Sequence, residues 1–369
     1  MARVLHIANW YPSFGEPKRA LWIKDQIELL SGMVDYDVWH VEVIKGRFRL
    51  SSYPVSESEN RLILSFPTKR WFLIEVLSGV LLVYLFLFKV KLKDYSLIHF
   101  HIAYPLLTYW HILRKMVNKP VVLSEHWSAY HYDFNITDKR KLKPIQKIFF
   151  NPLHLITVSG ALAKDIVRFS GNPNLIYTVV HNVVDCTIFN FQNLDISPDT
   201  FFMVSQWKDP KDPFTVLKVL TTLPDYKLRI GGYGEQLKDI EALISELGLS
   251  DRVTLLGSLN KHEIAAEMNR ATGFIHSSRY ETFSVVCAEA ISCGCPVIAS
   301  RVGGIPEFVN ESNGILVEGQ SFDQWASSLI KFAGIKFDRE VIQKSIQPVC
   351  DSGMKREHLL NIYKEHSID

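Results

Sequence analysis

The sequence predicts a two-domain α/β protein with parallel sheets, and three observations support that prediction. The chain has 369 residues, which is too long for one ordinary core and suits two domains of about 150–180 residues each. Short apolar runs, typical of strands, alternate with helical patterns along the whole chain. These runs are apolar on both faces, as in a parallel sheet covered by helices. Both halves show this pattern, so we expect two Rossmann-like domains that face each other across a cleft.

In the first half, strand-like runs are separated by stretches of helical length. The predicted strands begin at Val4, Asp37, Arg61, Ser96, Pro120, Leu153 and Thr178. Helices are expected at 20–30, 104–117 and 161–170. The segment 186–199 breaks the rhythm because it is polar and interrupted by Pro198. It is the predicted linker between a domain at 1–185 and a domain at 200–351.

The second half restarts the alternation with shorter connections. Its predicted strands are 201–205, 227–231, 253–256, 273–276, 296–299 and 314–317. Its predicted helices are 213–222, 235–247, 262–270, 284–293 and 322–332. A last helix within 352–369 has no strand after it, and we expect it to pack back on the first domain.

Charge and cysteine content limit the possible partners and the compartment. Residues 1–185 carry 23 Lys and Arg against 15 Asp and Glu, whereas the remainder carries 18 against 24. The basic half could face phosphate groups or an anionic leaflet, or it could be merely a solvated surface. The five cysteines are odd in number and do not resemble a disulfide scaffold, which favours a reducing compartment. The start of the chain leads into a strand rather than a signal peptide, so we expect a cytoplasmic protein.

The segment 72–88 is strongly apolar and is followed by lysines at 89, 91 and 93. It lies between two predicted strands, where a doubly wound fold needs a crossover helix, and Glu75 interrupts it. We therefore expect a crossover helix that is buried or partly faces a membrane on its cytoplasmic side. Shallow insertion is compatible with this interpretation. A transmembrane span is the alternative, although 17 residues are at the short limit for one.

The richest chemical pattern lies between His276 and Val309. A strand ends near His276, and a helix begins near Ser284 after a short loop. Free amide groups at a helix amino terminus bind phosphate, and Ser284 could be both cap and ligand contact. Glu281 stands before this helix and Glu289 within it, and carboxylates beside a phosphate site suit sugar hydroxyls. A nucleotide diphosphate sugar presents this combination of groups. Alternatively, Glu281 could serve only the helix dipole and Glu289 could lie on the surface, but the neighbours of Glu289 are apolar.

A set of motifs in the second half resembles glycosyltransferase family four, the retaining enzymes with the GT-B fold. They are Glu281-x7-Glu289-Ala290, Gly294-x-Pro296-Val297-Ile298-Ala299, Gly303-Gly304-x-x-Glu307, Gly314–Val317, Ile230–Gly234 and Arg252–Gly257. The first half is similar to the bacterial surface-polysaccharide branch at Trp10–Ser13, Lys24–Gln26 and Glu125–Trp127.

The resemblance implies a role for several residues. Three residues are implied to act at the reacting centre. Glu281 would contact donor-sugar hydroxyls, Lys211 would neutralise the leaving diphosphate, and His126 would lie near the reacting sugar. The implied donor contacts are Gly15, Gly257 at the base, the backbone of Thr282, Phe283, Ser284 and Val285, and Glu289 on the ribose. The family usually has Arg where this chain has Gln206, five positions before Lys211, so Lys208 could supply the missing charge.

The resemblance also implies retention at the anomeric carbon, without a covalent intermediate. Asp35-Tyr36-Asp37 has the spelling of a metal motif but is expected to precede a strand. We therefore expect no metal and no cofactor beyond the nucleotide-sugar donor, and electrostatic help from Lys211 and helix amides.

The expected acceptor is a glycan or a polyprenyl-diphosphate-linked glycan at the anionic inner leaflet, in surface polysaccharide synthesis. No nucleic-acid partner is expected. The alternatives are a nucleotide-sugar epimerase or a phosphorylase on the same scaffold, and a catalytically silent nucleotide- or glycan-binding subunit, which Gln206 favours. A dehydrogenase is disfavoured because no Gly-x-Gly-x-x-Gly follows the first strand.

Overall fold

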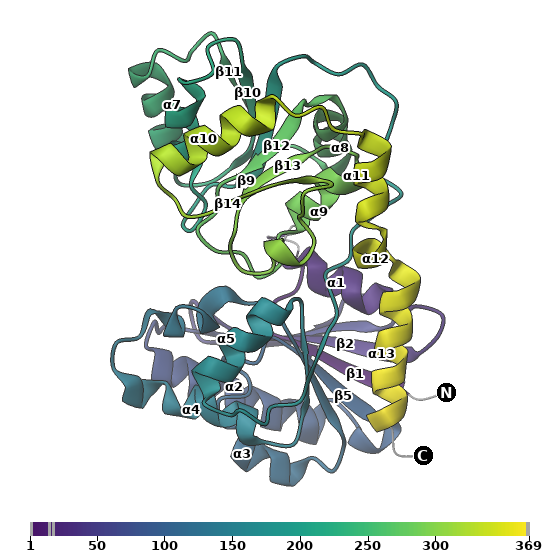
Figure 1. Ribbon diagram of the computed structural model, residues 1–369. Coiled ribbons are helices and arrows are strands. Elements are labelled where there is room, and N and C mark those ends of the chain that lie inside the picture. Colours follow the sequence, from purple (N-terminus) through teal and green to yellow (C-terminus); the bar gives the residue numbers. More distant parts are fainter. Residues whose placement is uncertain (1–2, 14–15, 17–18, 367–369) are drawn as a thin grey trace. The chain divides into compact units, whose positions relative to one another are not determined.

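The computed structural model describes residues 3–13, 16 and 19–366, and the chain divides into two compact units (Figure 1). The first unit is Met1–Asn182 together with Ser352–Asp369, and the second is Val183–Asp351. The expected linker 186–199 belongs to the second unit. Asn269 holds it there, because its side-chain nitrogen donates to the Asn190 carbonyl at 3.1 Å and its oxygen accepts from the Gln192 amide at 2.7 Å.

The sheet of the first unit has eight strands in the order β3-β4-β2-β1-β5-β6-β7-β8. The strands are β1 (Arg3–Ala8), β2 (Asp35–Lys45), β3 (Arg49–Pro54), β4 (Glu59–Phe66), β5 (Leu97–His101), β6 (Val121–Glu125), β7 (His154–Thr157) and β8 (Tyr177–Val179). All pairs are parallel except β3 with β4. Strand β3 was not predicted, because it is polar on both faces and ends in Pro54, as an edge strand can.

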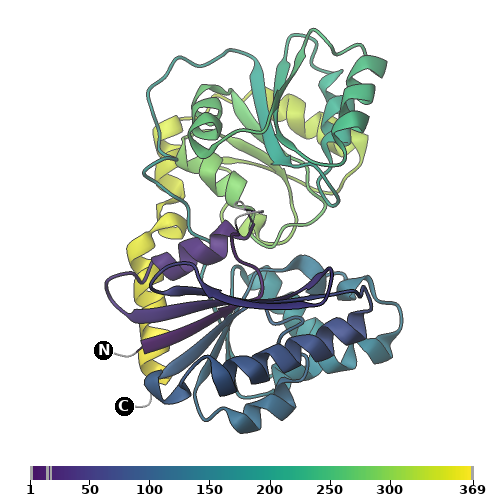
Figure 2. The same cartoon turned by 180° about the vertical axis from the view of Figure 1, so that it is seen from behind.

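Helices cover both faces of this sheet (Figures 1 and 2). The α-helices are α1 (Leu21–Glu28), α2 (Trp71–Phe88), α3 (Trp110–Leu113), α4 (Lys143–Gln146), α5 (Gly160–Ser170) and α13 (Ser352–His366). The 3-10 helices are η1 (Leu92–Asp94), η2 (Arg114–Met116), η3 (Ser128–Tyr130), η4 (Asp133–Asn135), η5 (Lys139–Lys141) and η6 (Lys147–Phe150). Helix α2 packs on β2 and β4, as expected of a crossover helix.

The helix predicted at 104–117 is wrong for half of its length. Only α3 and η2 form there, and the segment begins with irregular turns. Residues 104–109 form turns, and the first helical residue is Trp110. The apolar pattern therefore begins before the helix does.

The second unit has six parallel strands in the order β11-β10-β9-β12-β13-β14. The strands are β9 (Thr200–Gln206), β10 (Lys227–Tyr233), β11 (Val253–Gly257), β12 (Gly273–His276), β13 (Val297–Ser300) and β14 (Gly314–Val317). The helices are α6 (Pro213–Leu220), α7 (Leu237–Glu246), α8 (Lys261–Arg270), α9 (Val285–Ser292), η7 (Ile305–Glu307), α10 (Phe322–Ala333), α11 (Arg339–Ser345) and α12 (Gln347–Cys350). All six predicted strands are confirmed, whereas α11 and α12 were not predicted.

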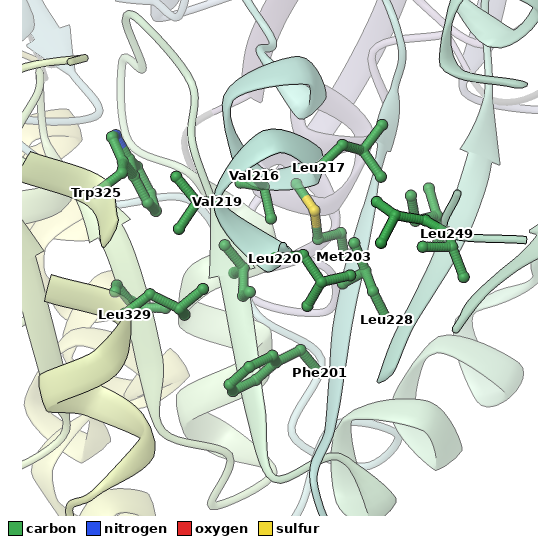
Figure 3. Close-up of a cluster of buried hydrophobic side chains, with 14 of the residues drawn as sticks. Phe201, Met203, Val216, Leu217, Val219, Leu220, Leu228, Leu249, Trp325 and Leu329 are labelled. Carbon is green, nitrogen blue, oxygen red and sulfur yellow. The ribbon is translucent and has the colours of Figure 1, made fainter. Parts of the chain in front are cut away.

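A large apolar cluster fixes α6 and α10 on this sheet (Figure 3). Phe201 and Met203 of β9, Leu217 and Leu220 of α6 and Trp325 of α10 are all at most 2% exposed. Burial of each such side chain contributes about 1.5–3 kcal/mol. The cluster therefore keeps β9 and α6, and the loop between them, in fixed positions.

Helix α13 packs on the first unit, although it lies at the far end of the chain. Its Tyr363 hydroxyl bonds His99 Nδ1 at 2.6 Å, and Arg356 donates to the Leu29 carbonyl at 2.9 Å. Beneath it, His6, His99 and His101 of β1 and β5 are at most 1% exposed. Burial lowers the pKa of each of these histidines, that of His6 to about 3.

Candidate active site

The candidate site lies where the strand order of the second sheet reverses (Figure 1). The chain runs from β9 outwards to β10 and β11, then returns to β12 on the other side of β9. Ligands of open α/β sheets bind at the carboxyl ends of the strands at such a switch point. The loops that follow β9 and β12 carry Lys211 and Glu281.

Glu281 is bonded by two side chains from these strand ends. Lys211 Nζ forms an ion pair with Glu281 Oε1, and His276 Nε2 lies 2.7 Å from the same oxygen. Burial alone would raise the pKa of Glu281, but the charge of Lys211 and the bond from His276 lower it to about 2. Burial lowers the pKa of His276, although the bond to Glu281 partly offsets this. Glu281 is therefore ionised at neutral pH, and a neutral His276 donates its Nε2–H to it.

Further bonds tie the two loops together. The Ser277 hydroxyl donates to the Asp212 carbonyl, and the Arg279 amide donates to the Pro210 carbonyl at 3.0 Å. The Arg279 guanidinium also pairs with Asp209. Lys211 and Glu281 are thus held together by backbone contacts as well as by their own ion pair.

The loop after β13 closes on the same place through two glycines. The Gly304 amide donates to the Glu281 carbonyl at 3.1 Å. Gly303 has a φ of +52°, and a Cβ there would lie 1.6 Å from that carbonyl oxygen. Only glycine fits, which gives the Gly303-Gly304 motif a structural reason.

Helix α9 begins four residues after Glu281. Ser284 is its N-cap residue, so the helix starts at Val285, slightly later than predicted. The expectation that Ser284 acts as a side-chain cap is wrong, because its φ of 76° is left-handed and its hydroxyl accepts no capping bond in the described chain. The first-turn amides of a helix have no partner within the helix, so they are available to an anion.

The predicted donor contacts lie around this helix start. Phe283 and Ser284 are buried, Thr282 and Val285 are half-buried, and Glu289 is 9% exposed in the second half of α9. The interpretation of Glu289 as a surface residue is thereby excluded.

The other predicted contacts lie at neighbouring strand ends. Gln206 ends β9 and Gly257 ends β11, and both are exposed. Lys208 is exposed, and its carbonyl accepts from the Lys211 amide at 2.8 Å. Gly15 lies outside the described residues.

The glycines that end β10 have a packing role. The Trp207 indole donates to the Gly231 carbonyl at 3.0 Å. A Cβ on Gly232 would lie 1.9 Å from the Ser205 carbonyl oxygen, and one on Gly234 would lie 2.2 Å from that of Trp207. These glycines allow the ends of β9 and β10 to approach closely.

His126 directly follows β6 in the first unit. Its Nδ1 lies 3.1 Å from Asn182 Oδ1, and its Nε2 has no hydrogen-bond partner among the residues that the structure describes. Burial lowers the pKa of His126 to about 4. Glu125 beside it accepts from the Ala103 amide at 2.7 Å and the Tyr130 hydroxyl at 2.6 Å, and burial raises its pKa to about 7. A neutral His126 with an unused nitrogen is suited to contact a ligand.

The Asp35–Asp37 segment has a different role from that of a metal motif. Asp37 is paired with Arg3 at 2.8 Å and accepts from the Tyr95 hydroxyl at 2.6 Å. It lies near the amino end of β2, opposite the carboxyl edge where ligands of such sheets bind.

Two residues of functional interest were missed or underused by the sequence analysis. His276 was treated only as the end of a strand, because a histidine at that position carries no pattern of its own. Glu125 appeared only within a motif, and its burial depends on the contacts of Ala103 and Tyr130.

Comparisons with known proteins match both halves of the chain. The family described as "Glycosyltransferase Family 4" matches residues 39–188, and "Glycosyl transferases group 1" matches residues 187–345. D-inositol 3-phosphate glycosyltransferase of Mycolicibacterium smegmatis is 30% identical over 231 residues, which are 58% of this chain and 50% of that protein. The Mycobacterium marinum enzyme of the same name is 31% identical over 190 residues, 47% of this chain and 41% of that protein. The chain thus spans half or less of the length of these relatives.

Solved structures share the fold over nearly the whole chain. Sucrose-phosphate synthase of Thermosynechococcus elongatus has a TM-score of 0.77 at 17% identity and covers 99% of both chains. Anabaena Alr3699/HepE in complex with UDP and glucose has a TM-score of 0.73 at 17% identity, with 99% of this chain and 100% of that chain covered. The lipopolysaccharide outer core galactosyltransferase WaaB has a TM-score of 0.74 at 16% identity, with 98% and 99% covered. With two α/β units of this kind and family matches to both halves, the chain belongs to glycosyltransferase family four and has the GT-B fold.

Proposed function

We propose that this protein is a retaining glycosyltransferase that moves a sugar from a nucleotide-sugar to a glycan or lipid-linked glycan in surface polysaccharide synthesis. The observation that carries the proposal is the cluster of Lys211, Glu281 and His276 at the β9/β12 switch point, beside the start of α9. A cation, an ionised carboxylate and helix amides together suit a diphosphate joined to a hydroxylated ring.

The ionisation of Glu281 decides its chemical role. With a pKa of about 2 it carries no proton at neutral pH, so it cannot act as a general acid. It accepts hydrogen bonds from donor-sugar hydroxyls instead. Lys211 and the amides that begin α9 stabilise the negative charge that develops on the departing diphosphate. The acceptor attacks from the face that the diphosphate leaves, and its proton passes to the leaving phosphate.

In this mechanism the chain itself supplies the positive charge, so we expect transfer without a metal. The check is turnover after dialysis against EDTA, with and without added Mg²⁺ or Mn²⁺. Unchanged turnover is the expected result, and a rate restored only by a divalent ion would contradict it.

The donor class is tested by a thermal-shift panel of UDP-, GDP-, ADP- and dTDP-sugars. The complex of HepE with UDP and glucose supports a UDP-sugar as the first candidate. One donor class should raise the melting temperature of the wild type, and Glu289→Ala should lose most of that shift. A panel without any shift would contradict the proposal.

A silent binding subunit is the second candidate, because Gln206 lacks the charge that the family usually has there. Gln206 and Lys208 are both exposed at the end of β9, so a charge could still be supplied by Lys208. Product analysis separates the candidates. Transfer gives a longer acceptor and a free nucleotide diphosphate, an epimerase gives a new sugar without an acceptor, and a silent subunit gives neither.

A lipid-linked acceptor, one of the two proposed, requires the first unit to approach a membrane. Helix α2 is long and apolar enough to cross a bilayer by length and composition, a property it shares with core helices of soluble proteins. Glu75 is 9% exposed and bonds Tyr104, so this face of α2 packs on protein. Phe72, Leu87 and Phe88 are exposed near its two ends. This distribution supports peripheral contact with the anionic inner leaflet.

A further inference from the structure

A groove of about 780 Å³ lies on the first sheet, over strands β2, β3 and β4. Alternate side chains of these three strands line it, together with Ser13, Glu16 and Arg19 of the segment after β1. Its size falls within the range of small-ligand pockets. It includes the unpredicted strand β3.

The register of the strands explains why these side chains meet. His40, Arg61 and Tyr53 are paired across β2, β4 and β3, and every second residue along each strand points to the same face. This is the face of Val38, which packs against α1 together with Ala8. Helix α1 thus covers β1 and the start of β2, whereas the groove lies over the later part of β2 and over β4 and β3. The faces of parallel strands are normally covered, so an open polar face is a candidate site.

The charges in the groove are unequally compensated. Arg19 donates two bonds to Glu42, at 2.6 and 3.0 Å, and one to Glu16 at 3.2 Å, so one guanidinium serves two carboxylates. Arg61 donates to the uncharged Pro12 carbonyl at 2.7 Å. Arg49 is exposed on β3. Among the described residues, neither Arg49 nor Arg61 forms an ion pair, so both guanidinium groups can bind an anion. The three arginines of the lining outnumber its two glutamates, and the excess positive charge lies on the β3 and β4 wall.

The remaining lining suits a sugar ring. The Tyr53 ring, 46% exposed, stands opposite Arg61 and offers an aromatic face with a polar tip. Ser51 and Ser65 supply hydroxyls on the same face, and Ile63 supplies an apolar contact. A pyranose has a partly apolar face and a rim of hydroxyls, so it matches this mixture.

We propose that this groove is a subsite for acidic sugars of the acceptor, in which the ring carries a carboxylate or a phosphate. The proposal rests on the proposed glycosyl transfer. Arg49 and Arg61 bind the anionic group, since guanidinium groups bind carboxylates and phosphates in a bidentate manner. Tyr53 holds the ring. The groove lies over the carboxyl-terminal half of β2. Open α/β sheets bind ligands at the carboxyl ends of their strands. Most of its lining residues are polar or charged, which favours a sugar chain over a bilayer.

The test is isothermal titration calorimetry of the full chain at low salt. The probes are trigalacturonate, glucose 6-phosphate and the neutral maltotriose. We expect at least one acidic probe to bind at least tenfold more tightly than maltotriose. Arg49→Gln and Tyr53→Ala should each lower that affinity about tenfold. Arg47→Gln removes the same charge from an exposed residue outside the groove and should change the affinity less than twofold.

Several outcomes would overturn the proposal. They are equal binding of maltotriose, no binding of either acidic probe, and an equal loss in Arg47→Gln. A loss of binding to phosphatidylglycerol vesicles in Arg49→Gln, without any loss for the acidic probes, would assign this arginine to a membrane surface instead.

The donor thermal shift, measured on the same variants, separates this proposal from the proposed function. A normal donor shift without acidic-sugar binding refutes only the subsite. Acidic-sugar binding without any donor shift in the wild type refutes only the transferase.

Discussion

Glu281 depends on two partners that come from different loops. Lys211 follows β9 and His276 ends β12, and both reach the same carboxylate oxygen. Because the carboxylate is only 12% exposed, its charge would be costly to bury without them. The same pair places a cation and a carboxylate side by side, and the proposed function assigns the first to the diphosphate and the second to the sugar hydroxyls.

The first prediction concerns this carboxylate. Glu281→Gln keeps the shape but removes the charge, so we expect roughly a 100-fold loss of turnover. The pKa of Glu281 in the folded protein, about 2, lies below its ordinary 4.5. Its stabilising contribution is therefore present above pH 4.5 and is lost as the pH falls towards 2. Urea unfolding at pH 6, 4 and 3 measures this. Between pH 6 and 3 the free energy of unfolding should decrease less in Glu281→Gln than in the wild type. An identical pH dependence in both proteins would contradict the assignment.

The second prediction separates binding from chemistry at Lys211. Lys211→Ala should lower kcat far more than it weakens donor affinity, because the leaving diphosphate gains charge in the transition state. Steady-state kinetics with the donor identified by thermal shift provide the measurement. Lys218→Ala, an exposed lysine on α6, is the matched control. Equal losses in kcat and donor affinity would count against a leaving-group role.

At this scale the sequence offers candidate residues, and the structure adds their geometry. Spacing and resemblance predict roles for Lys211, Glu281 and Glu289, and the structure pairs the first two and buries the third. His276 was missed, since its role depends on a contact with Glu281 that no local pattern reveals. The side-chain cap at Ser284 was wrong, because a left-handed φ cannot be read from a serine.

Among the structural elements, the loop after β13 has the tightest steric limit at the site. Gly303→Ala would place a methyl group against the Glu281 carbonyl at a positive φ. We expect it to lower the free energy of unfolding by more than about 1 kcal/mol, the typical cost of a non-glycine residue at positive φ, and to abolish the donor thermal shift. Gly248→Ala has a φ of +66° but open space around it, so it measures the backbone cost alone. Equal effects of the two substitutions would show that the close contact is unimportant.

The next prediction is that helix α2 contacts the membrane surface. Phe72→Ser and Phe88→Ser remove side chains that are 66% and 69% exposed, so folding should be little affected. Sedimentation with phosphatidylglycerol vesicles should show weaker binding of both variants. Phe150→Ser, which removes a phenylalanine that is 61% exposed in η6, is the control. Wild-type binding in the α2 variants, or a similar loss in the control, would refute contact through α2.

The elements also show where periodicity is a reliable guide. In the second unit, β12 and β14 have the predicted bounds, because their short apolar runs lie between clear turn residues. In the first unit β3 was missed because a polar edge strand has no alternation, and it builds one wall of the groove. The helix predicted at 104–117 fails at 104–109, where the structure has turns that the apolar pattern did not reveal.

At the scale of the whole molecule, the two ends of the chain meet in the first unit through buried histidines. His99 links β5 to Tyr363 of α13, and His6 Nδ1 lies 3.0 Å from His101 Nε2. Their lowered pKa values mean that the folded state binds fewer protons than the unfolded state below pH 6.5. Stability should therefore fall as the pH falls from 6.5 towards 3. The pKa of Glu125 is raised to about 7, so Glu125 takes up its proton in the folded protein first and stabilises the fold between pH 7 and 4.5. This one proton offsets only part of the effect of the three histidines.

The corresponding measurement is urea unfolding between pH 7.5 and 4.5. His101→Gln removes one of the three buried imidazoles, so below about pH 5.5 the slope of stability against pH should decrease by roughly 1.4 kcal/mol per pH unit. His262→Gln, an exposed substitution on α8, is the control. An unchanged slope in His101→Gln would contradict burial of a neutral imidazole.

The central claim is that the second unit binds a nucleotide-sugar at the β9/β12 switch point. A crystal structure of the protein with the UDP-sugar that gives the largest thermal shift tests it most directly. We predict diphosphate oxygens within hydrogen-bond distance of the first amides of α9 and of Lys211, with the ribose on Glu289. A nucleotide bound elsewhere, or side chains filling this place, would contradict the account.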